Sequence, residues 1–149
     1  MQAFFLDRFM KAAIEEARKS LAEGGIPICS VLVKNEKIIG RGHNKRVQKK
    51  SPVLHAEIDC LQNAGRIGSY KGCVLYSTLM PCFFCSGAIV QFGIKKVFAG
   101  ESKNFSGAKK FLQSQGVKVS DFDLEECKSL MQGFIKSNKR LWLEDIGKL

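Results

Sequence analysis

Residues 73–91 read CVLYSTLMPCFFCSGAIVQ and join two patterns of secondary structure. The apolar run Cys73–Thr78, rich in strand-forming residues, predicts a strand. A helix is expected to open at Pro81, because proline suits the first helical turn, and to continue through Gln91 to an end at Gly93. A strand that leads directly into a helix is the repeating unit of α/β folds.

The same alternation extends along the chain in both directions. Apolar residues at helical spacing, Phe5 among them, predict a first helix over Phe4–Leu21. The other predicted elements are strands at Ile28–Val33, Lys37–Gly42, Lys96–Ala99 and Val117–Ser120, and helices at Leu54–Asn63, Ser106–Gln115 and Leu124–Ser137. The segment Lys139–Ile146 is expected to form a short helix or coil. We therefore expect one sheet with helices on its faces, in a single domain over residues 1–149.

The composition is that of a globular protein, with 45% apolar and 26% charged residues. No segment approaches the ~20 consecutive apolar residues that a membrane-spanning helix needs. Residues Met1–Met10 lack the design of a signal peptide, so the expected location is cytoplasmic. Disulfides are not expected in that compartment, and Cys29, Cys60, Cys73 and Cys127 are interpreted as small buried apolar residues.

The formal net charge of +10 suits an anionic partner such as RNA, and equally a protein that is merely soluble. Part of this charge forms a run without an intervening acid, which comprises Arg41, Lys45, Arg46, Lys49 and Lys50. A solvated loop over residues 43–52 is the favoured interpretation of this run, with contact to nucleic acid as the alternative.

The sulfur atoms of Cys82 and Cys85 are expected to point the same way, because residues three apart share a helix face. The start of a helix also favours thiolates. A lone C-x-x-C pair is compatible with a redox couple or half of a structural zinc site, but no thioredoxin-like pattern or second C-x-x-C is present. With His55, the two cysteines make three ligands, and three protein ligands plus water are typical of catalytic zinc.

Glu57 follows His55 by two residues and is the candidate general base. An isolated glutamate in a helix is usually a surface residue. Two thiolates would balance the charge of a zinc ion, however, so such a site needs a base nearby at neutral pH. The pattern H-x-E followed by P-C-x-x-C is the signature of the zinc deaminases that act on nucleobases, in which the glutamate moves protons and is not a ligand.

The sequence resembles the fungal-type cytosine deaminases over nearly its whole length. The matching stretches are Glu23–Ile28, Gly40–Asn44, His55–Glu57, Ser86–Ile89, Asn104–Phe105 and, most specific to the family, Trp142–Gly147. The resemblance implies a three-layer α/β/α cytidine-deaminase-like fold with a mixed central sheet of about five strands. It also implies a homodimer with one zinc ion per subunit.

The resemblance further implies a set of substrate contacts. Asn44 would donate its amide hydrogens to the pyrimidine, and Asp145 would accept a ring N–H. Phe105 and Trp142 would cover the ring, while Ile28 would line the pocket. The alternatives are a loop cap for Asn44, core packing for Ile28 and Phe105, and packing of the C-terminal segment for Trp142 and Asp145.

The chain departs from the family pattern at several positions, which are Cys29 and Ser30 in place of glycines, Ala56 in place of glycine, Met80 in place of serine, and Phe83 with Phe84 inside the C-x-x-C. Ala56 and Met80 are expected to line the substrate pocket, where added bulk at Cys29 and Met80 would reshape it. Phe83 and Phe84 point about 100° apart on a helix, so at least one is expected at a subunit interface.

We therefore expect hydrolytic deamination of a free nucleobase, with cytosine as the leading substrate. A C-terminal lid that closes over the ring would leave little room for a polymer. The alternatives are a tRNA adenosine deaminase, favoured by the positive charge and the H-A-E sequence, and a deaminase of guanine or another amino-heterocycle. A zinc-bound interaction module without activity is the alternative from another class, and Glu57 argues against it.

Overall fold

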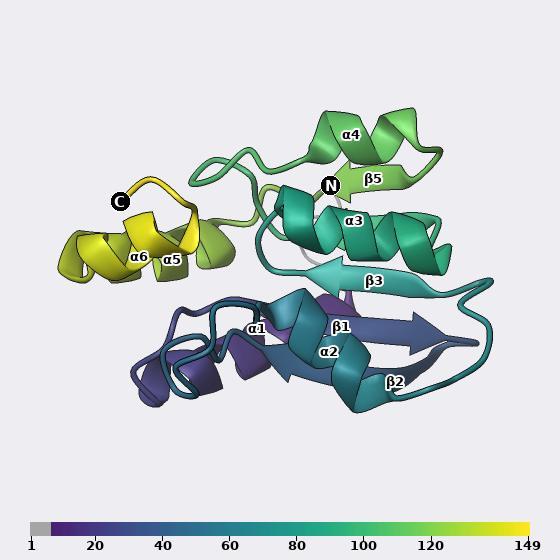
Figure 1. The fold of residues 1–149 in the computed structure, drawn as a ribbon, viewed down its shortest axis with the longest axis horizontal. Coiled ribbons are helices and arrows are strands. Elements are labelled where there is room, and N and C mark those ends of the chain that lie inside the picture. The colour runs from purple at the N-terminus through teal and green to yellow at the C-terminus, as the bar shows by residue number, and fades with distance from the viewer. Residues whose placement is uncertain (1–6) are drawn as a thin grey trace.

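A central five-stranded sheet lies between layers of helices in the computed structural model, which describes residues 7–149 (Figure 1). The strands are β1 (Cys29–Lys34), β2 (Lys37–His43), β3 (Val74–Ser77), β4 (Lys96–Ala99) and β5 (Lys118–Asp121). Their order across the sheet is β2-β1-β3-β4-β5. β1 is antiparallel to both of its neighbours, whereas β3, β4 and β5 run parallel. The start of β1 therefore lies at the same edge of the sheet as the ends of β2 and β3.

The helices are α1 (Arg8–Ala22), α2 (Ala56–Ala64), α3 (Phe83–Phe92), α4 (Lys109–Ser114), α5 (Glu125–Ser137) and α6 (Lys139–Asp145). The amphipathic α1 buries Met10, Ala13 and Ala17 against one face of the sheet. The helices α2, α3 and α4 share a second core cluster on the opposite face, through residues such as Cys60, Ile89 and Leu112. These two clusters make the three-layer α/β/α arrangement that the sequence predicts.

Helix α2 packs directly against the backbone of β2. A Cβ atom added at Gly42 would lie 2.2 Å from the backbone nitrogen of Cys60, and one at Gly40 would lie 2.8 Å from the carbonyl oxygen of Cys60. Side chains at these two positions would push the helix outward, so the glycines set how close α2 comes to the sheet.

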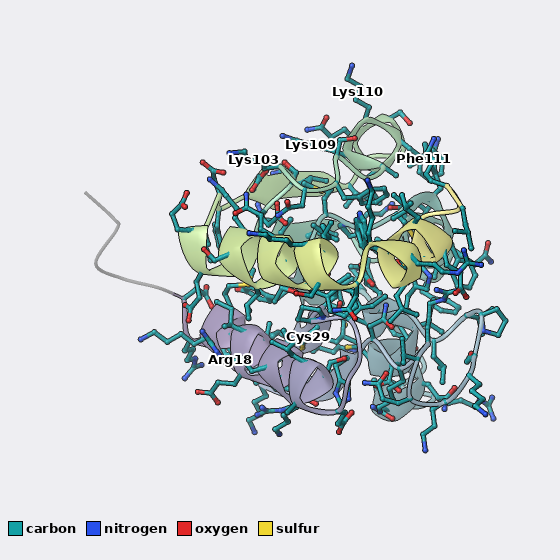
Figure 2. The ribbon with its side chains drawn as sticks, turned by 90° about the vertical axis from the view of Figure 1, so that its left-hand side faces the viewer. Arg18, Cys29, Lys103, Lys109, Lys110 and Phe111 are labelled. Carbon is teal, nitrogen blue, oxygen red and sulfur yellow. The ribbon has the colours of Figure 1, made fainter. Side chains whose placement is uncertain are left out.

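The chain returns to the same edge of the sheet in its last two helices. Figure 2 shows α5 beside α1, where Arg18 pairs with Glu126. A third core cluster joins these helices to the start of β1 through Ile28, Phe134 and Trp142. The segment Lys139–Asp145, expected as helix or coil, is helical in the structure.

The predicted elements are all present, with shifts at their ends. Helix α3 begins at Phe83 with Cys82 as its N-cap, so Pro81 precedes the cap and does not open the helix. Helix α4 begins at Lys109, because Gly107 takes a positive φ of +64° in the preceding turn. The part of the first predicted helix that contains Phe5 lies outside the described residues. Among the described residues, no helix has the length and apolar character needed to cross a membrane.

Candidate metal and catalytic site

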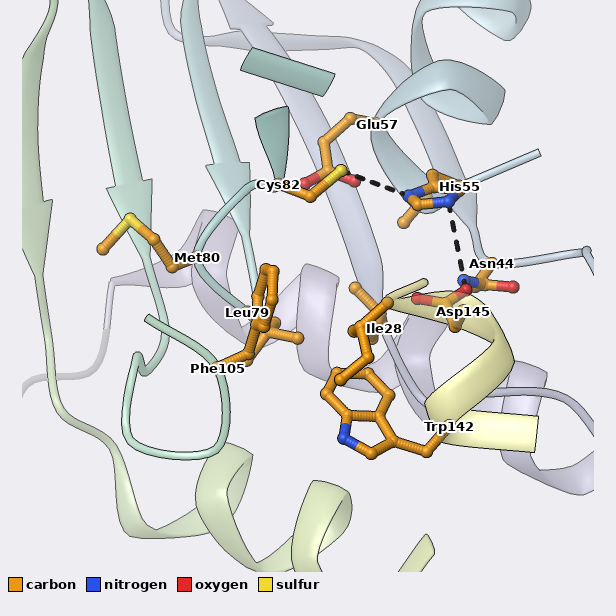
Figure 3. Close-up of a pocket in the computed structure, with 12 residues that line it drawn as sticks. Ile28, Asn44, His55, Glu57, Leu79, Met80, Cys82, Phe105, Trp142 and Asp145 are labelled. Atoms are coloured by element: carbon orange, nitrogen blue, oxygen red, sulfur yellow. Dashed lines mark hydrogen bonds and ion pairs between the residues drawn. The ribbon is translucent and has the colours of Figure 1, made fainter. Parts of the chain in front are cut away.

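Two helix N-termini meet at the end of β3 and bring the predicted ligands together. His55 is the N-cap of α2, Cys82 is the N-cap of α3, and Cys85 lies in the first turn of α3. One ligand atom from each of these residues lies within 4.8 Å of the other two. His55 Nδ1 and Cys82 Sγ are 3.5 Å apart (Figure 3). Zinc bonds of ~2.3 Å to sulfur and ~2.0 Å to nitrogen at a tetrahedral angle give about this separation, so the three groups fit one zinc ion.

The protein environment favours a thiolate on Cys82. A hydrogen bond from the Cys85 thiol, supported by one with His55, lowers the pKa of Cys82 to about 4. The pKa of Cys85 is raised, because its thiol donates to Cys82 and because it is buried. In the free protein Cys82 is therefore the thiolate and Cys85 is the thiol that donates to it. Sulfur atoms are soft donors, and such donors suit zinc.

The far side of the His55 ring faces Asp145, whose Oδ1 is 3.9 Å from Nε2 (Figure 3). Burial alone would lower the pKa of His55, but the hydrogen bond with Cys82 and the charge of Asp145 raise it overall. A carboxylate on the far side of a histidine ligand is a common arrangement around protein-bound metals, and here the 3.9 Å separation is longer than a hydrogen bond.

Glu57 lies in the first turn of α2 with only 4% of its surface exposed. Burial, with the charge of Cys82, raises the pKa of Glu57 to about 7. The hydroxyl of Ser77, at the end of β3, donates to Glu57 Oε2 across 3.2 Å. A buried carboxyl group whose pKa lies near neutrality is suited to accept and return a proton.

A small pocket opens beside these groups. It is lined by Ile28, Asn44, His55, Ala56, Glu57, Leu79, Met80, Cys82, Phe105, Trp142, Asp145 and Ile146. Every residue expected at the site is in this wall except Cys85, which is buried behind Cys82. Leu79 and Ile146 were not predicted, since apolar residues carry no sequence signal that separates a pocket wall from a core.

The amide of Asn44 has a fixed direction. Its Oδ1 accepts from the backbone nitrogen of Arg46 at 3.0 Å, so the Nδ2 hydrogens point the other way. One of them donates to Asp145 Oδ1 at 3.3 Å. The backbone of Asn44 is held as well, because its carbonyl oxygen accepts from Ser20 Oγ and its nitrogen donates to Ile28 O. Asn44 therefore presents a donor to the pocket and Asp145 presents an acceptor.

Arg46 connects the loop after β2 to the last helix. Its Nη1 lies 3.3 Å from Asp145 Oδ1, and its Nη2 lies 3.5 Å from Glu144 Oε2. Its Nε donates to the carbonyl oxygen of Pro52 at 3.1 Å. Neighbouring Lys45 pairs with the buried Asp59 at 2.8 Å. Two members of the basic run thus serve internal contacts, which the sequence pattern did not reveal.

Aromatic side chains close the pocket opposite the metal ligands. The rings of Phe105 and Trp142 meet edge to face with centroids 6.0 Å apart. The loop that carries Phe105 is held by Glu101, which is fully buried and accepts from the backbone nitrogens of Lys103 and Asn104. Trp142 is 5% exposed, so the side of the pocket opposite the metal ligands is covered.

The departures from the family pattern differ in how they reach the pocket. Cys29 is fully buried and packs in the core cluster of α1, away from the pocket wall. Met80 lines the pocket, but its side chain turns away from His55 and Asp145 (Figure 3). The expected reshaping by the Cys29 side chain is therefore wrong, because successive side chains of a strand point to opposite faces. Phe83 and Phe84 are 70% and 50% exposed.

Comparisons with known proteins agree with this geometry. A family model described as the cytidine and deoxycytidylate deaminase zinc-binding region matches residues 5–101. A cytosine deaminase from Candida albicans is 45% identical over 142 residues, which cover 93% of this chain and 95% of that protein. A tRNA-specific adenosine deaminase from Aquifex aeolicus is 34% identical over 139 residues, with 86% and 92% covered.

Solved structures show the same fold. A guanine deaminase from Nitrosomonas europaea superposes with a TM-score of 0.72 at 20% identity, covering 85% of this chain and 82% of that one. A structure from a study of tRNA:A34 deaminases superposes with a TM-score of 0.65 at 28% identity, covering 76% and 95%. At such identities the guanine deaminase supports the fold alone.

Proposed function

Because the chain belongs to the zinc-dependent cytidine and deoxycytidylate deaminase family and is a hydrolytic deaminase, we propose that it converts free cytosine to uracil and ammonia. The observation that carries this proposal is the opposed pair on the substrate side of the pocket, a donor at Asn44 beside an acceptor at Asp145. The relative from Candida albicans, a cytosine deaminase, supports the same substrate.

Zinc is the cofactor of this family, and His55, Cys82 and Cys85 are the proposed ligands. When bound, the ion would lower the pKa of a water molecule enough to supply a nucleophile at neutral pH. Three protein ligands leave a fourth position for that water.

Glu57 is the proposed proton carrier. Its carboxylate takes a proton during attack on the amino-bearing ring carbon and returns it to the adjacent ring nitrogen. It then assists the departure of ammonia. Its burial supports this role, since a carboxyl group with a pKa of about 7 can both hold and release a proton under physiological conditions.

Asn44 and Asp145 are the proposed contacts to the edge of the pyrimidine. The amide hydrogens of Asn44 match a ring carbonyl, and the carboxylate of Asp145 matches a ring N–H. In cytidine that ring nitrogen carries ribose, so the nucleoside would lose the hydrogen bond and meet the covered side of the pocket. We propose that Ile28, Ala56, Phe105 and Trp142 enclose the ring, and that Met80 contributes to the wall of the pocket.

Deamination of adenosine in tRNA is the second candidate, which the relative from Aquifex aeolicus favours. Two observations favour the free base instead. Arg46 and Lys45 are occupied by Asp145 and Asp59, so they are not available to phosphates. Trp142 in the last helix also forms one wall of the pocket, which narrows the space for a polymer.

We also propose that two copies of the chain associate through the first turn of α3. Phe83 and Phe84 present large apolar surfaces there, and aromatic residues are enriched in interfaces. Such exposure is costly for a lone subunit. Light scattering at micromolar concentration should give the mass of a dimer, and a monomer would contradict this part of the proposal. A single catalytic domain in the cytoplasm remains the expected context.

The deciding experiment is an ammonia-release assay of the zinc-loaded protein. Cytosine, cytidine, guanine and an unmodified tRNA are the substrates to compare. We expect turnover of cytosine and none of cytidine. Faster release from the tRNA, with an affinity that weakens steeply as salt is raised, would favour the second candidate.

A further inference from the structure

One departure from the family pattern does reach the catalytic side of the pocket. Ser30 in β1 lies opposite Ser77 in β3 in the antiparallel register, and their hydroxyl oxygens are 3.2 Å apart. Ser77 in turn donates to Glu57 Oε2 across 3.2 Å. Both serines are fully buried. Two hydroxyl groups therefore lead from the middle of the sheet to the carboxyl group of Glu57.

We propose that Ser77, supported by Ser30, is a positioning residue for Glu57. The proposal rests on the proposed function of Glu57 as proton carrier. A glutamate side chain has several rotatable bonds, and the hydrogen bond from Ser77, together with the one from the Cys85 thiol, restricts how its end turns. A donor at Oε2 restricts the plane of the carboxyl group beside the pocket. Small errors of placement in a proton carrier are costly in rate, because the transfer needs hydrogen-bond geometry.

The directions of the hydrogen bonds are consistent along the chain of groups. Ser30 donates to the Ser77 oxygen, and Ser77 donates its own hydrogen to Glu57. Hydrogen bonds in such a series strengthen one another in a dry interior.

Packing alone does not explain the two hydroxyl groups. Ser30 also lies opposite Gly42 of β2, so small residues form a row across β2, β1 and β3. At the Gly42 end of this row α2 approaches so closely that a Cβ would collide with Cys60. Alanine would fill the space of serine at positions 30 and 77 without a polar group to satisfy. The neighbouring Thr78 uses its hydroxyl differently, to accept from the backbone nitrogen of Cys29.

The test compares Ser77→Ala with Ser77→Thr in the zinc-loaded protein. We expect Ser77→Ala to lower kcat for cytosine about ten-fold, the effect of losing one hydrogen bond to a charged group. KM and zinc content should stay within about two-fold of the original values. Ser77→Thr keeps the hydroxyl and should restore most of kcat. Ser86→Ala is the matched control, because Ser86 is also fully buried but its hydroxyl has no partner among the described residues.

Ser30 acts on Glu57 only through Ser77, so a second expectation follows for variants of Ser30. Ser30→Ala should lower kcat about two- to three-fold, and the Ser30→Ala/Ser77→Ala double variant should be no slower than Ser77→Ala alone. Losses that multiply in the double variant would overturn the role of Ser30. Unchanged kcat in Ser77→Ala, or a parallel loss of zinc and thermal stability, would overturn the role of Ser77.

A crystal structure of zinc-loaded Ser77→Ala separates this inference from the proposed function. We expect the Glu57 carboxyl group to occupy more than one orientation in the variant and one in the original protein. An unmoved, single orientation in the variant would overturn the inference. If the original protein releases no ammonia from cytosine, the proposed substrate fails, and the orientation of Glu57 still decides the role of Ser77.

Discussion

The two sides of the pocket are built in different ways. On the metal side, His55 and Cys82 are N-caps of α2 and α3, so their positions follow from where two helices begin. On the substrate side, Asn44 and Asp145 are 101 residues apart in the sequence and meet through side-chain contacts. The difference teaches that the backbone at two helix starts places the proposed metal ligands, whereas contacts between a few distant side chains place the proposed substrate contacts.

The most severe test of the metal side is removal of a ligand. Cys85→Ala should lose zinc and all detectable turnover, and it should unfold at a lower temperature, because metal binding contributes to the stability of the fold. Metal analysis and thermal unfolding measure these effects. Cys73→Ala is the control, since Cys73 is buried in a core cluster remote from the pocket wall. Full zinc content in Cys85→Ala would refute the ligand set.

Glu57→Gln separates chemistry from metal binding on the same side. The variant should keep zinc and its fold, because Glu57 is not a proposed ligand. Turnover of cytosine should fall by a factor of ~10²–10⁴, the usual contribution of a general acid–base group. Steady-state kinetics on protein of verified zinc content measure this. Near-normal turnover in the loaded variant would remove Glu57 from the mechanism.

Asp145→Ala addresses the substrate side. We expect kcat/KM for cytosine to fall by roughly 10²-fold, because the ring N–H would lose its acceptor inside a closed pocket. Zinc content should change little, which distinguishes this variant from the ligand variants. If zinc is lost together with activity, then the 3.9 Å contact between Asp145 and His55 matters more for the metal than for the base.

Arg46→Ala should give the smallest effect, and it tests how the two sides are joined. The variant loses the contacts to Asp145 and Glu144, so the last helix is held less firmly over the base. We expect KM for cytosine to rise about ten-fold while kcat changes less, which kinetics over a range of cytosine concentrations would reveal. Lys49→Ala is the matched control, because Lys49 belongs to the same basic run but is exposed. Equal effects of the two variants would show that only the charge of the run matters.

The same contrast explains how much could be predicted from the sequence. The proposed ligands and Glu57 lie within 31 positions of one another, at the starts of two consecutive helices. A short sequence pattern was therefore enough to select them. Local periodicity also predicted one sheet with helices on its faces, and the family resemblance implied the α/β/α layers; the sheet order and the superposed structures confirm both.

Contacts that depend on strand register or on distant loops could not be predicted. Ser77 reaches Glu57, and Ser30 reaches Ser77, only because β1 and β3 pair in a particular register. The bond between Arg46 and Asp145 requires the last helix to return to the loop after β2. The late start of α4 has a local cause, since Gly107 has a positive φ and a Cβ there would lie 2.6 Å from Pro81 O.

The place of Trp142 makes the protein its own optical probe. It is the single tryptophan of the sequence, and it is buried on the substrate side against Phe105. Light absorbed at the red edge of the indole band excites this residue without the tyrosines, so the emission comes from one known position. Since Trp142 lines the pocket, a base that enters it is expected to come close to the indole, which should alter the intensity of the emission. Binding to variants that no longer turn over substrate can thus be followed without a label.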